Sequence, residues 1–525
     1  MKKIVLLIFS ILISITVLAQ TSKTLNCIAG NLSTLLSNSD RSSISNLTLT
    51  GTIDARDFKT MRDSMPYLAT IDLSGANISA YSGYNGTYYT GSNMTYPVNT
   101  VPTYAFSGTS VASGKRSLTS IVFPNTLTSI GDEAFYDCES LVGTLTFPST
   151  LTSIGSMAFI YCIKLTSIII PESVTSIESS AFTGNTGLIS VNSNNPIYSS
   201  ADGVLFNKTF SLLINCPTSK SDSYSIPNTV KIIGEYAFEN CNLLNTITIP
   251  SSVDTIQEYA FWNCSNLISL NIPTSVTSIA DYAFVNCKKL PSINIPSSIK
   301  TIQNGTFYGC ENLVSVDIPQ TITSIGATSF YECLKLKDIT IPKTVTSIGR
   351  LAFKGCKSLD SINIPDYVTK IGTSAFYDCT GLKAIYASPV FPVDISSSIT
   401  VFGNVDTVNC ILHVGAGSVG EYRAANQWKA FNIMEAENIL YYKVGVPELN
   451  QSICVYPNPV KTSFRIKNGG DATVLVYNSI GDLVLNKRIN NDELISTKNL
   501  SNGVYIVQIR SNNSMVTQSL LIDNY

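Results

Sequence analysis

Cysteine is the reactive side chain that the sequence offers most often, with 13 copies in 525 residues. Nine copies stand at one position of a repeated phrase such as VTSIGRLAFKGC: Cys138, Cys162, Cys241, Cys264, Cys287, Cys310, Cys333, Cys356 and Cys379. Zinc needs four ligands that converge on one point, whereas side chains at one repeat position lie in a line. We therefore expect this column to consist of buried free thiols that pack as small apolar groups. The sequence leaves open how the other four pair: Cys27, Cys216, Cys410 and Cys454.

Acid–base catalysis has few candidate residues. A hydrolase triad needs a base beside a nucleophile, and the single histidine, His413, lies in the strand-like phrase ILHV, where we expect a surface or cap residue. We find no acidic residues in repeat register, and paired carboxylates would also need a cleft. The phrase GAGSVG at 415–420 matches G-x-G-x-x-G but lacks the surrounding βαβ unit. We predict no catalytic, cofactor-binding or metal site, and no enzyme activity.

Aromatic residues offer a binding site instead. Some stand two residues before a repeated phenylalanine and others directly after one, so that they should stack in neighbouring repeats: Tyr236, Tyr259, Tyr282, Trp262, Tyr308 and Tyr331. Exposed tyrosine and tryptophan are enriched at binding hot spots. These six are our candidate partner-binding residues. The alternative interpretation is that they only cover the edge of the repeat.

The repeated phenylalanine sets the period that must position these side chains. It recurs every 23 residues at Phe238, Phe261, Phe284, Phe307, Phe330, Phe353 and Phe376, with earlier copies at Phe106, Phe135, Phe159 and Phe182. A period of this length is typical of a leucine-rich-repeat solenoid. In the unit LDSINIPDYVTKIGTSAFYDC the apolar residues lie on one side, so that a single coil cannot bury them. We predict coils stacked about 4.8 Å apart as short parallel strands, with mainly β structure, turns and short helices.

Composition shifts divide the chain. Residues 1–19 read as a secretory signal peptide, and residues 20–101 as an N-terminal cap with variable leucine-rich repeats. The 23-residue solenoid covers 102–388 and contains a hairpin insertion at about 191–226. A capping coil with a short helix follows at 389–445. Alternating apolar strands separated by Asn, Gly and Asp predict a small β-sandwich at 452–525.

Charge is sparse and balanced, with 34 Lys plus Arg against 36 Asp plus Glu. This balance gives no electrostatic case for a nucleic-acid partner. No stretch after the signal peptide approaches the roughly 18 apolar residues of a membrane span, so we expect no transmembrane segment in the mature chain.

Two parts of the sequence resemble known protein families. LPSINIPSSIKTIQNGTFYGC resembles the BspA-like leucine-rich repeats of bacterial and protist surface proteins, and CILHVGAGSVGEYRAANQWKAFNIMEAE resembles the last coil of that family, in which Trp428 and Phe431 would close the core. The order VYPNPV, LVYNSIGDLVL, LSNGVYIVQI resembles the C-terminal sorting domain of the type IX secretion system of Bacteroidetes. The second resemblance implies that the secretion machinery acts on residues 452–525 and that the product is secreted or held at the outer-membrane cell surface.

The first resemblance implies a binding or adhesion module for a host or neighbouring-cell macromolecule, either protein or glycan. A structural or accessory surface protein without a specific ligand is the alternative. A surface glycan-processing enzyme is a remote third possibility. The sequence does not identify the ligand, the face that binds it, the oligomeric state or whether the tail is cleaved.

Overall fold

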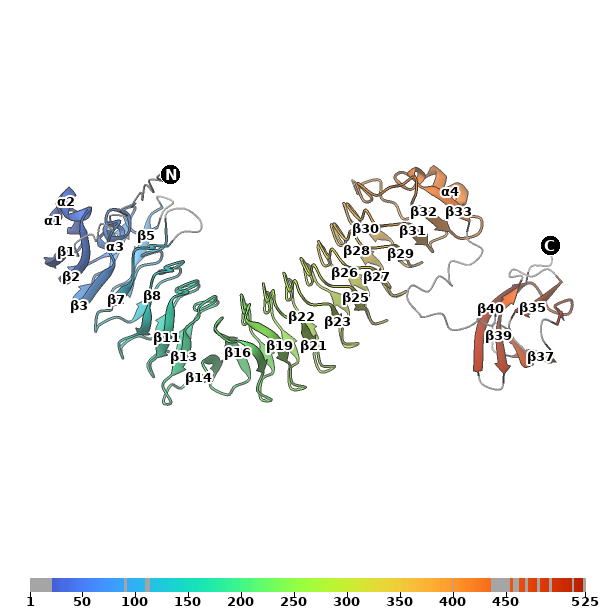
Figure 1. Cartoon of the computed structure of the whole chain (residues 1–525), viewed down its shortest axis with the longest axis horizontal. Helices are drawn as coiled ribbons and strands as arrows, with labels where there is room; N and C mark the ends of the chain where they lie inside the picture. Colours follow the sequence, from blue (N-terminus) through green and yellow to red (C-terminus); the bar gives the residue numbers. More distant parts are fainter. Residues whose placement is uncertain are drawn as a thin grey trace, which may run out of the picture. The chain divides into compact units, whose positions relative to one another are not determined.

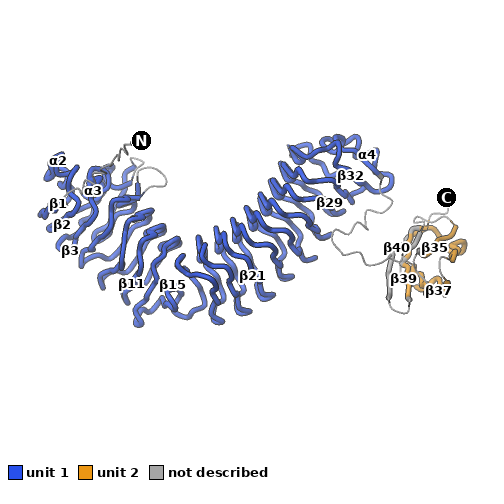
Figure 2. The backbone as a smooth tube through the Cα atoms, viewed as in Figure 1, with its two compact units in different colours: residues 1–444 blue, residues 445–525 orange. Residues whose placement is uncertain are grey.

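The structure is a computed structural model that describes residues 21–88, 92–108, 114–398, 400–435, 454–456, 462–467, 471–478, 482–490, 493–511 and 514–522. The expected signal peptide, residues 1–19, lies outside the described residues. The chain forms two compact units, 1–444 and 445–525 (Figure 2). We describe each unit by itself.

Parallel strands, one from each coil, form the first row of the larger unit (Figure 1). The row is made of five sheets in chain order. Its strands are β1 (Thr21–Cys27), β2 (Ile44–Ile53), β3 (Thr70–Ile78), β7 (Ser120–Val122), β9 (Gly143–Thr146), β11 (Leu165–Ile170), β13 (Leu188–Val191), β17 (Asp222–Ser225), β19 (Leu244–Thr248), β21 (Ser269–Asn271), β23 (Ser292–Asn294), β25 (Ser315–Asp317), β27 (Asp338–Ile339), β29 (Ser361–Ile364), β31 (Ala384–Ala387), β32 (Ile411–Val414) and β33 (Asn432–Glu435).

Shorter parallel strands form a second row, in which most coils contribute two residues. These strands are β6 (Thr100–Val101), β8 (Ser129–Ile130), β10 (Ser153–Ile154), β12 (Ser176–Ile177), β18 (Ile232–Ile233), β20 (Thr255–Ile256), β22 (Ser278–Ile279), β24 (Thr301–Ile302), β26 (Ser324–Ile325), β28 (Ser347–Ile348) and β30 (Lys370–Ile371). The register pairs equivalent residues of successive coils, for example Ile256 with Ile279. This arrangement confirms the predicted solenoid of short parallel strands.

A third ladder joins the coils at the turn that carries the repeated phenylalanine. Tyr236, Phe238 and Asn240 donate their N–H groups to carbonyls of the next coil, at 3.2, 2.8 and 2.9 Å. Tyr236 and Asn240 have φ values of 54° and 59°. The left-handed backbone explains why the position two residues after the phenylalanine is so often Asn, Asp or Gly, which tolerate it.

The phenylalanine rings form a stacked column in the core. Phe307 is 1% exposed, and its ring centroid lies 5.7 Å from that of Phe284 and 5.4 Å from that of Phe330. The column is interrupted between Phe182 and Phe238, where the buried apolar residues also divide into two clusters. The ring of each coil is therefore buried by the ring of the next coil.

The cysteine column lies beside these rings. Each thiol donates to a carbonyl of the preceding coil; Cys264, for example, bonds the carbonyl oxygen of Phe238 at 3.0 Å, and Cys379 that of Phe353 at 3.0 Å. Twelve cysteines with described side chains are buried and unpaired, in agreement with the predicted free thiols. Burial raises the pKa of the Cys310 thiol to about 12. The side chain of Cys454 lies outside the described residues.

Residues 192–226 interrupt the repeat, and we call this segment the interruption. It contains β14 (Tyr198–Ala201), β15 (Val204–Asn207) and β16 (Leu212–Asn215), of which β15 pairs antiparallel with both others. Strand β16 then pairs parallel with β18, so the interruption joins the second row. In the first row it contributes only β17, which pairs with β19, while β13 ends the preceding sheet.

Both ends of the solenoid carry helices. Those at the N-terminal end are α1 (Leu32–Leu35), α2 (Asn38–Arg41) and α3 (Ala55–Asp63), with a hairpin of β4 (Tyr81–Gly83) and β5 (Met94–Tyr96) after them. At the other end α4 (Val419–Ala424) and the 3-10 helix η1 (Trp428–Ala430) precede β33. Trp428 and Phe431 are 1% and 5% exposed, which confirms their predicted role in closing the core.

The smaller unit has two antiparallel sheets around one core, as the predicted sandwich requires. One sheet contains β34 (Cys454–Tyr456), β35 (Ser463–Lys467) and β38 (Ile495–Ser496). The other contains β36 (Ala472–Tyr477), β37 (Leu483–Ile489), β39 (Gly503–Ser511) and β40 (Ser514–Ile522). Phe464 from the first sheet and Val474 from the second are both buried in the shared core.

Replacing Phe307 with alanine should lower the free energy of unfolding by about 3–5 kcal/mol, because a buried ring is lost from the column. The neighbouring Tyr308→Ala change is the control, since Tyr308 is only half-buried. Urea unfolding followed by circular dichroism measures both. An unchanged midpoint for Phe307→Ala would contradict its place in the core.

The cysteine column should consist of free thiols that react only after unfolding. Thiol titration of unreduced protein should find most of the nine column thiols in denaturant and few of them in native buffer, because burial and a raised pKa both oppose thiolate formation. Fewer than three reactive thiols in denaturant would instead indicate a disulfide ladder.

Candidate functional site

Four aromatic rings form one surface cluster, which we call the aromatic patch: Tyr236, Tyr259, Trp262 and Tyr282. Tyr259 lies between the other two tyrosines, with ring centroids 4.9 and 5.0 Å away and planes within 7° of parallel. Trp262 leans against Tyr236 and Tyr259 at 5.9 and 5.5 Å. All four side chains are half-buried and lie outside the apolar core. The structure thus brings together four of the six predicted residues.

The other two predicted residues, Tyr308 and Tyr331, form a separate stacked pair at 4.7 Å. The ammonium group of Lys354 lies 5.2 Å from the ring centre of Tyr331 and 5.3 Å from that of Tyr377. Between the pair and the aromatic patch, the equivalent position to Tyr282 is Gly305, and the Tyr282 ring occupies the space that a side chain there would need.

An acidic column runs beside the aromatic patch and corrects the expectation that no acids recur in register. Glu235, Glu258 and Asp281 precede the three tyrosines on successive coils. Partial burial, together with the charges of Glu235 and Asp281, raises the pKa of Glu258. Among the described residues, no Lys or Arg forms an ion pair with any of the three. The patch therefore carries unneutralised negative charge.

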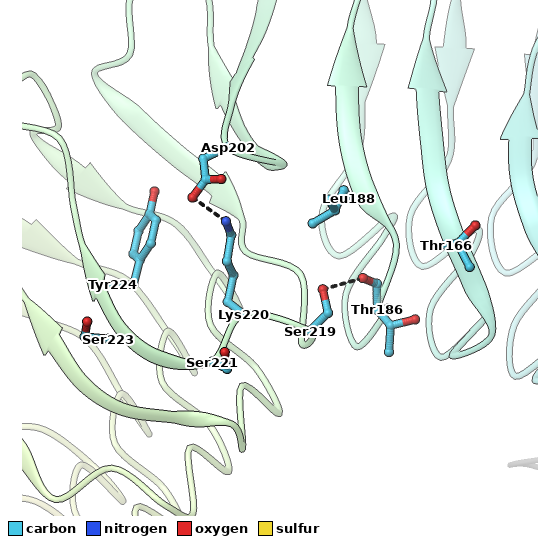
Figure 3. A pocket seen from close by; sticks show the side chains of 9 residues that line it. All are labelled: Thr166, Thr186, Leu188, Asp202, Ser219, Lys220, Ser221, Ser223 and Tyr224. Carbon is cyan, nitrogen blue, oxygen red and sulfur yellow. Dashed lines mark hydrogen bonds and ion pairs between the residues drawn. The ribbon is translucent and has the colours of Figure 1, made fainter.

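A second feature of the surface is a hollow of about 600 Å³ at the interruption, between β13 and β17 (Figure 3). Hydroxyl groups, one ion pair and the apolar side chain of Leu188 surround it. Its lining residues are Thr166, Thr186, Leu188, Asp202, Ser219, Lys220, Ser221, Ser223 and Tyr224. At one end Thr218 and Ser219 bond the carbonyls of Asn185 and Thr186, the Ser219 hydroxyl at 2.7 Å, and so join the two sheet ends.

Three residues after Tyr236, a buried carboxyl group links the two sides of the interruption. Glu239 is 2% exposed, and its Oε1 accepts a hydrogen bond of 2.6 Å from the hydroxyl of Tyr161. Its Oε2 has no hydrogen-bond partner. Burial raises the pKa of Glu239 to about 7, against the opposing effect of the Tyr161 hydrogen bond.

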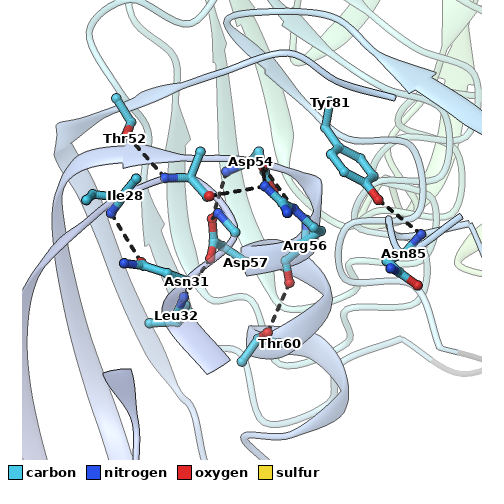
Figure 4. A network of polar contacts seen from close by, with 12 residues as sticks. Ile28, Asn31, Leu32, Thr52, Asp54, Arg56, Asp57, Thr60, Tyr81 and Asn85 are labelled. Atoms are coloured by element: carbon cyan, nitrogen blue, oxygen red, sulfur yellow. Dashed lines mark hydrogen bonds and ion pairs between the residues drawn. The ribbon is translucent and has the colours of Figure 1, made fainter. Parts of the chain in front are cut away.

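The densest charged network of the N-terminal coils is structural (Figure 4). Asp57 accepts hydrogen bonds from the backbone N–H groups of Gly30, Leu32 and Asp54 at 2.7–2.9 Å. Arg56 pairs with Asp54 at 2.6 Å and lies 4.7 Å from the ring centre of Tyr81. These bonds cap α3 and fix the preceding loop, so that both carboxylates already have partners within the cap.

Two other candidates from the sequence, His413 and the GAGSVG phrase, lie in the last coils of the solenoid. His413 stacks on Tyr386 at 4.7 Å, and burial lowers its pKa. The GAGSVG phrase directly follows β32, and its last two residues, Val419 and Gly420, begin the six-residue helix α4. Within the described part of the chain, no group of three or more His, Cys, Asp or Glu residues could hold a metal ion. No helix in that part is long and apolar enough to span a membrane.

Two protein-family models match the sequence. The model of the BspA type leucine rich repeat region matches six copies within residues 99–221, 215–337 and 300–404, which together exceed half of the chain. The chain belongs to the BspA-type leucine-rich repeat family. Residues 454–523 match the secretion system C-terminal sorting domain. The BspA-type protein is therefore exported by type IX secretion to the cell surface or beyond it.

Several solved structures are similar to this chain. A leucine-rich repeat protein from Eubacterium ventriosum is 28% identical, with 64% of this chain and 90% of that chain covered and a TM-score of 0.50. A leucine rich cell surface protein from Faecalibacterium prausnitzii is 25% identical, with 69% and 91% covered and a TM-score of 0.38. The pneumococcal vaccine antigen PcpA is 19% identical, with 77% and 82% covered and a TM-score of 0.39. The comparison with curated proteins gave no match.

Sequence reasoning did not identify the hollow, the acidic column or Glu239. The acidic column was visible in principle, since Glu235, Glu258 and Asp281 follow the 23-residue period. Asp202 and Lys220 carry no such signal, because they are 18 residues apart and meet only through the path of the interruption.

We predict that the buried Glu239 carboxyl makes the free energy of unfolding of this BspA-type protein decrease as pH rises. The unfolded group loses its proton near its ordinary pKa of 4.5 and the folded group near 7, so that between these values the folded state binds more protons. The Glu239→Gln variant should lose this slope and unfold less readily at pH 8, by up to about 3 kcal/mol. Chemical unfolding across pH measures the effect, with the exposed Glu235→Gln as control. If the unfolding free energy of Glu239→Gln still depended on pH in this range, the pH dependence would arise from another group.

Proposed function

We propose that this exported BspA-type protein is a binding module that attaches to a macromolecule of a host or of a neighbouring cell. The aromatic patch is the proposed contact site, and its partner is a protein surface rich in Lys or Arg. The alternative, a structural surface protein without a specific ligand, requires no such site.

The aromatic patch carries the proposal. Its rings are held by stacking and by the turn ladder, so that little side-chain freedom would be lost on binding. Aromatic side chains with partly exposed faces are the commonest anchors of protein interfaces. A cationic side chain placed over Tyr259 or Trp262 would also be attracted by the ring electrons.

The acidic column supports a cationic partner. Glu235, Glu258 and Asp281 follow one another on successive coils, and the raised pKa of Glu258 reflects its partial burial together with repulsion from the other two carboxylates. Lysine or arginine side chains of a partner would reduce the repulsion among these carboxylates and would lie beside the tyrosine rings. The pair of Tyr308 and Tyr331 extends the site by two coils but already has Lys354 over one ring.

Catalysis is not part of the proposal. Glycoside hydrolysis uses two carboxyl groups about a scissile bond. Among the nine residues that line the hollow at the interruption, Asp202 is the one carboxylate, and it is paired with Lys220.

The double variant Tyr259→Ala with Trp262→Ala should weaken binding to a captured partner at least tenfold, about 1.4 kcal/mol. The partner is first captured with the exported chain from panels of matrix and bacterial surface proteins and glycans, and affinity is then measured by surface plasmon resonance. The matched control, Tyr367→Ala with Phe391→Ala, removes two rings that are 67% and 70% exposed elsewhere. Equal binding by both double variants would refute the patch as the contact site.

Glu258→Gln should weaken the same interaction and reduce its dependence on salt, since one screened attraction is removed.

Cooperative unfolding should persist in the Tyr259→Ala with Trp262→Ala variant, because its two rings lie outside the apolar core.

A further inference from the structure

The hollow at the interruption exposes the hydroxyl group of an otherwise buried tyrosine. Tyr224 is 9% exposed, and its ring packs against Phe238 at 5.9 Å. Its hydroxyl makes no hydrogen bond to any described residue and lies at the hollow, on the side of Asp202 and Lys220 (Figure 3). A ligand that enters the hollow can bond this hydroxyl, and little side-chain freedom would be lost because the ring is already held by packing.

The groups around Tyr224 both donate and accept hydrogen bonds. Asp202 and Lys220 form an ion pair at the rim, with side chains 79% and 16% exposed. The hydroxyls of Thr166 and Ser223 line the opposite walls. Leu188, 47% exposed, adds an apolar surface.

We propose that this hollow binds one sugar unit of a neutral saccharide. Neighbouring sugar hydroxyls each donate and accept, and can therefore bond a carboxylate, an ammonium and a tyrosine hydroxyl at the same time. The C–H face of the sugar would lie on Leu188. The volume of about 600 Å³ falls within the usual range of small-ligand sites, roughly 300–1,000 Å³.

An extended peptide is the competing occupant, because β17 is the end strand of its sheet. The facing strand does not offer a free edge. The Ile189 N–H donates to the carbonyl of Gly203 at 2.9 Å, and the Val191 N–H to the hydroxyl of Ser200 at 2.9 Å. Ser219 bridges to Thr186 at one end, so that the space is bounded there and does not continue as a groove along a strand.

This site is independent of the aromatic patch, and the test keeps the two apart. Methyl glycosides of glucose, mannose, galactose and N-acetylglucosamine are added in turn to the exported chain at millimolar concentration, and binding is followed by saturation-transfer NMR. At least one glycoside should bind. Tyr224→Phe, which keeps the ring, should weaken that binding about fivefold or more, and Asp202→Asn should weaken it similarly.

Tyr367→Phe makes the same chemical change at an exposed tyrosine and should leave glycoside binding unchanged, as should the Tyr259→Ala with Trp262→Ala variant. Failure of all four glycosides to bind would overturn the proposal, as would equal binding by wild type, Tyr224→Phe and Asp202→Asn. Binding of a short Val- and Thr-rich peptide in place of any glycoside would overturn it in favour of strand addition.

Discussion

A single coil of this protein cannot cover its own apolar residues, and every other property of the solenoid follows from that constraint. The inward side chains of each coil are buried only when the next coil lies on them in register. The stacked phenylalanine rings are the clearest expression of this dependence, since Phe353 contacts Phe330 on one side and Phe376 on the other at 5.2 and 5.3 Å. The thiol column and the three backbone ladders follow the same register.

The register that builds the core also arranges the surface into columns of equivalent positions. Where successive coils carry tyrosine, the rings stack; where they carry carboxylates, the charges repel one another. The aromatic patch and its acidic column are two consequences of one period. The interruption is the place where the period fails, and there the surface acquires a hollow, and the buried Glu239 bonds Tyr161 from the other side of the interruption.

Periodic features of this fold could be predicted from the sequence, and features outside the period could not. The phenylalanine and cysteine columns, the parallel strands and the closing role of Trp428 were predictable because identical spacing implies identical environment. The left-handed backbone at Tyr236 was not, since tyrosine rarely adopts it and the ladder of the next coil imposes it. The helices α1–α3 and the pairing of Asp202 with Lys220 depend on contacts in non-repeating segments, where no second copy reveals the environment.

The claim that coils must stack in register can be tested by removing one coil. Deleting residues 336–358 joins Lys335 to Leu359 and removes one 23-residue unit away from both proposed sites. Urea unfolding followed by circular dichroism should show a folded, cooperatively unfolding protein, because the coils on either side present equivalent faces. Deleting only residues 336–346, about half a coil, should disrupt the stack. Loss of folded structure in the full-coil deletion, or equal stability of the two deletions, would contradict the account that stacking in register determines this fold.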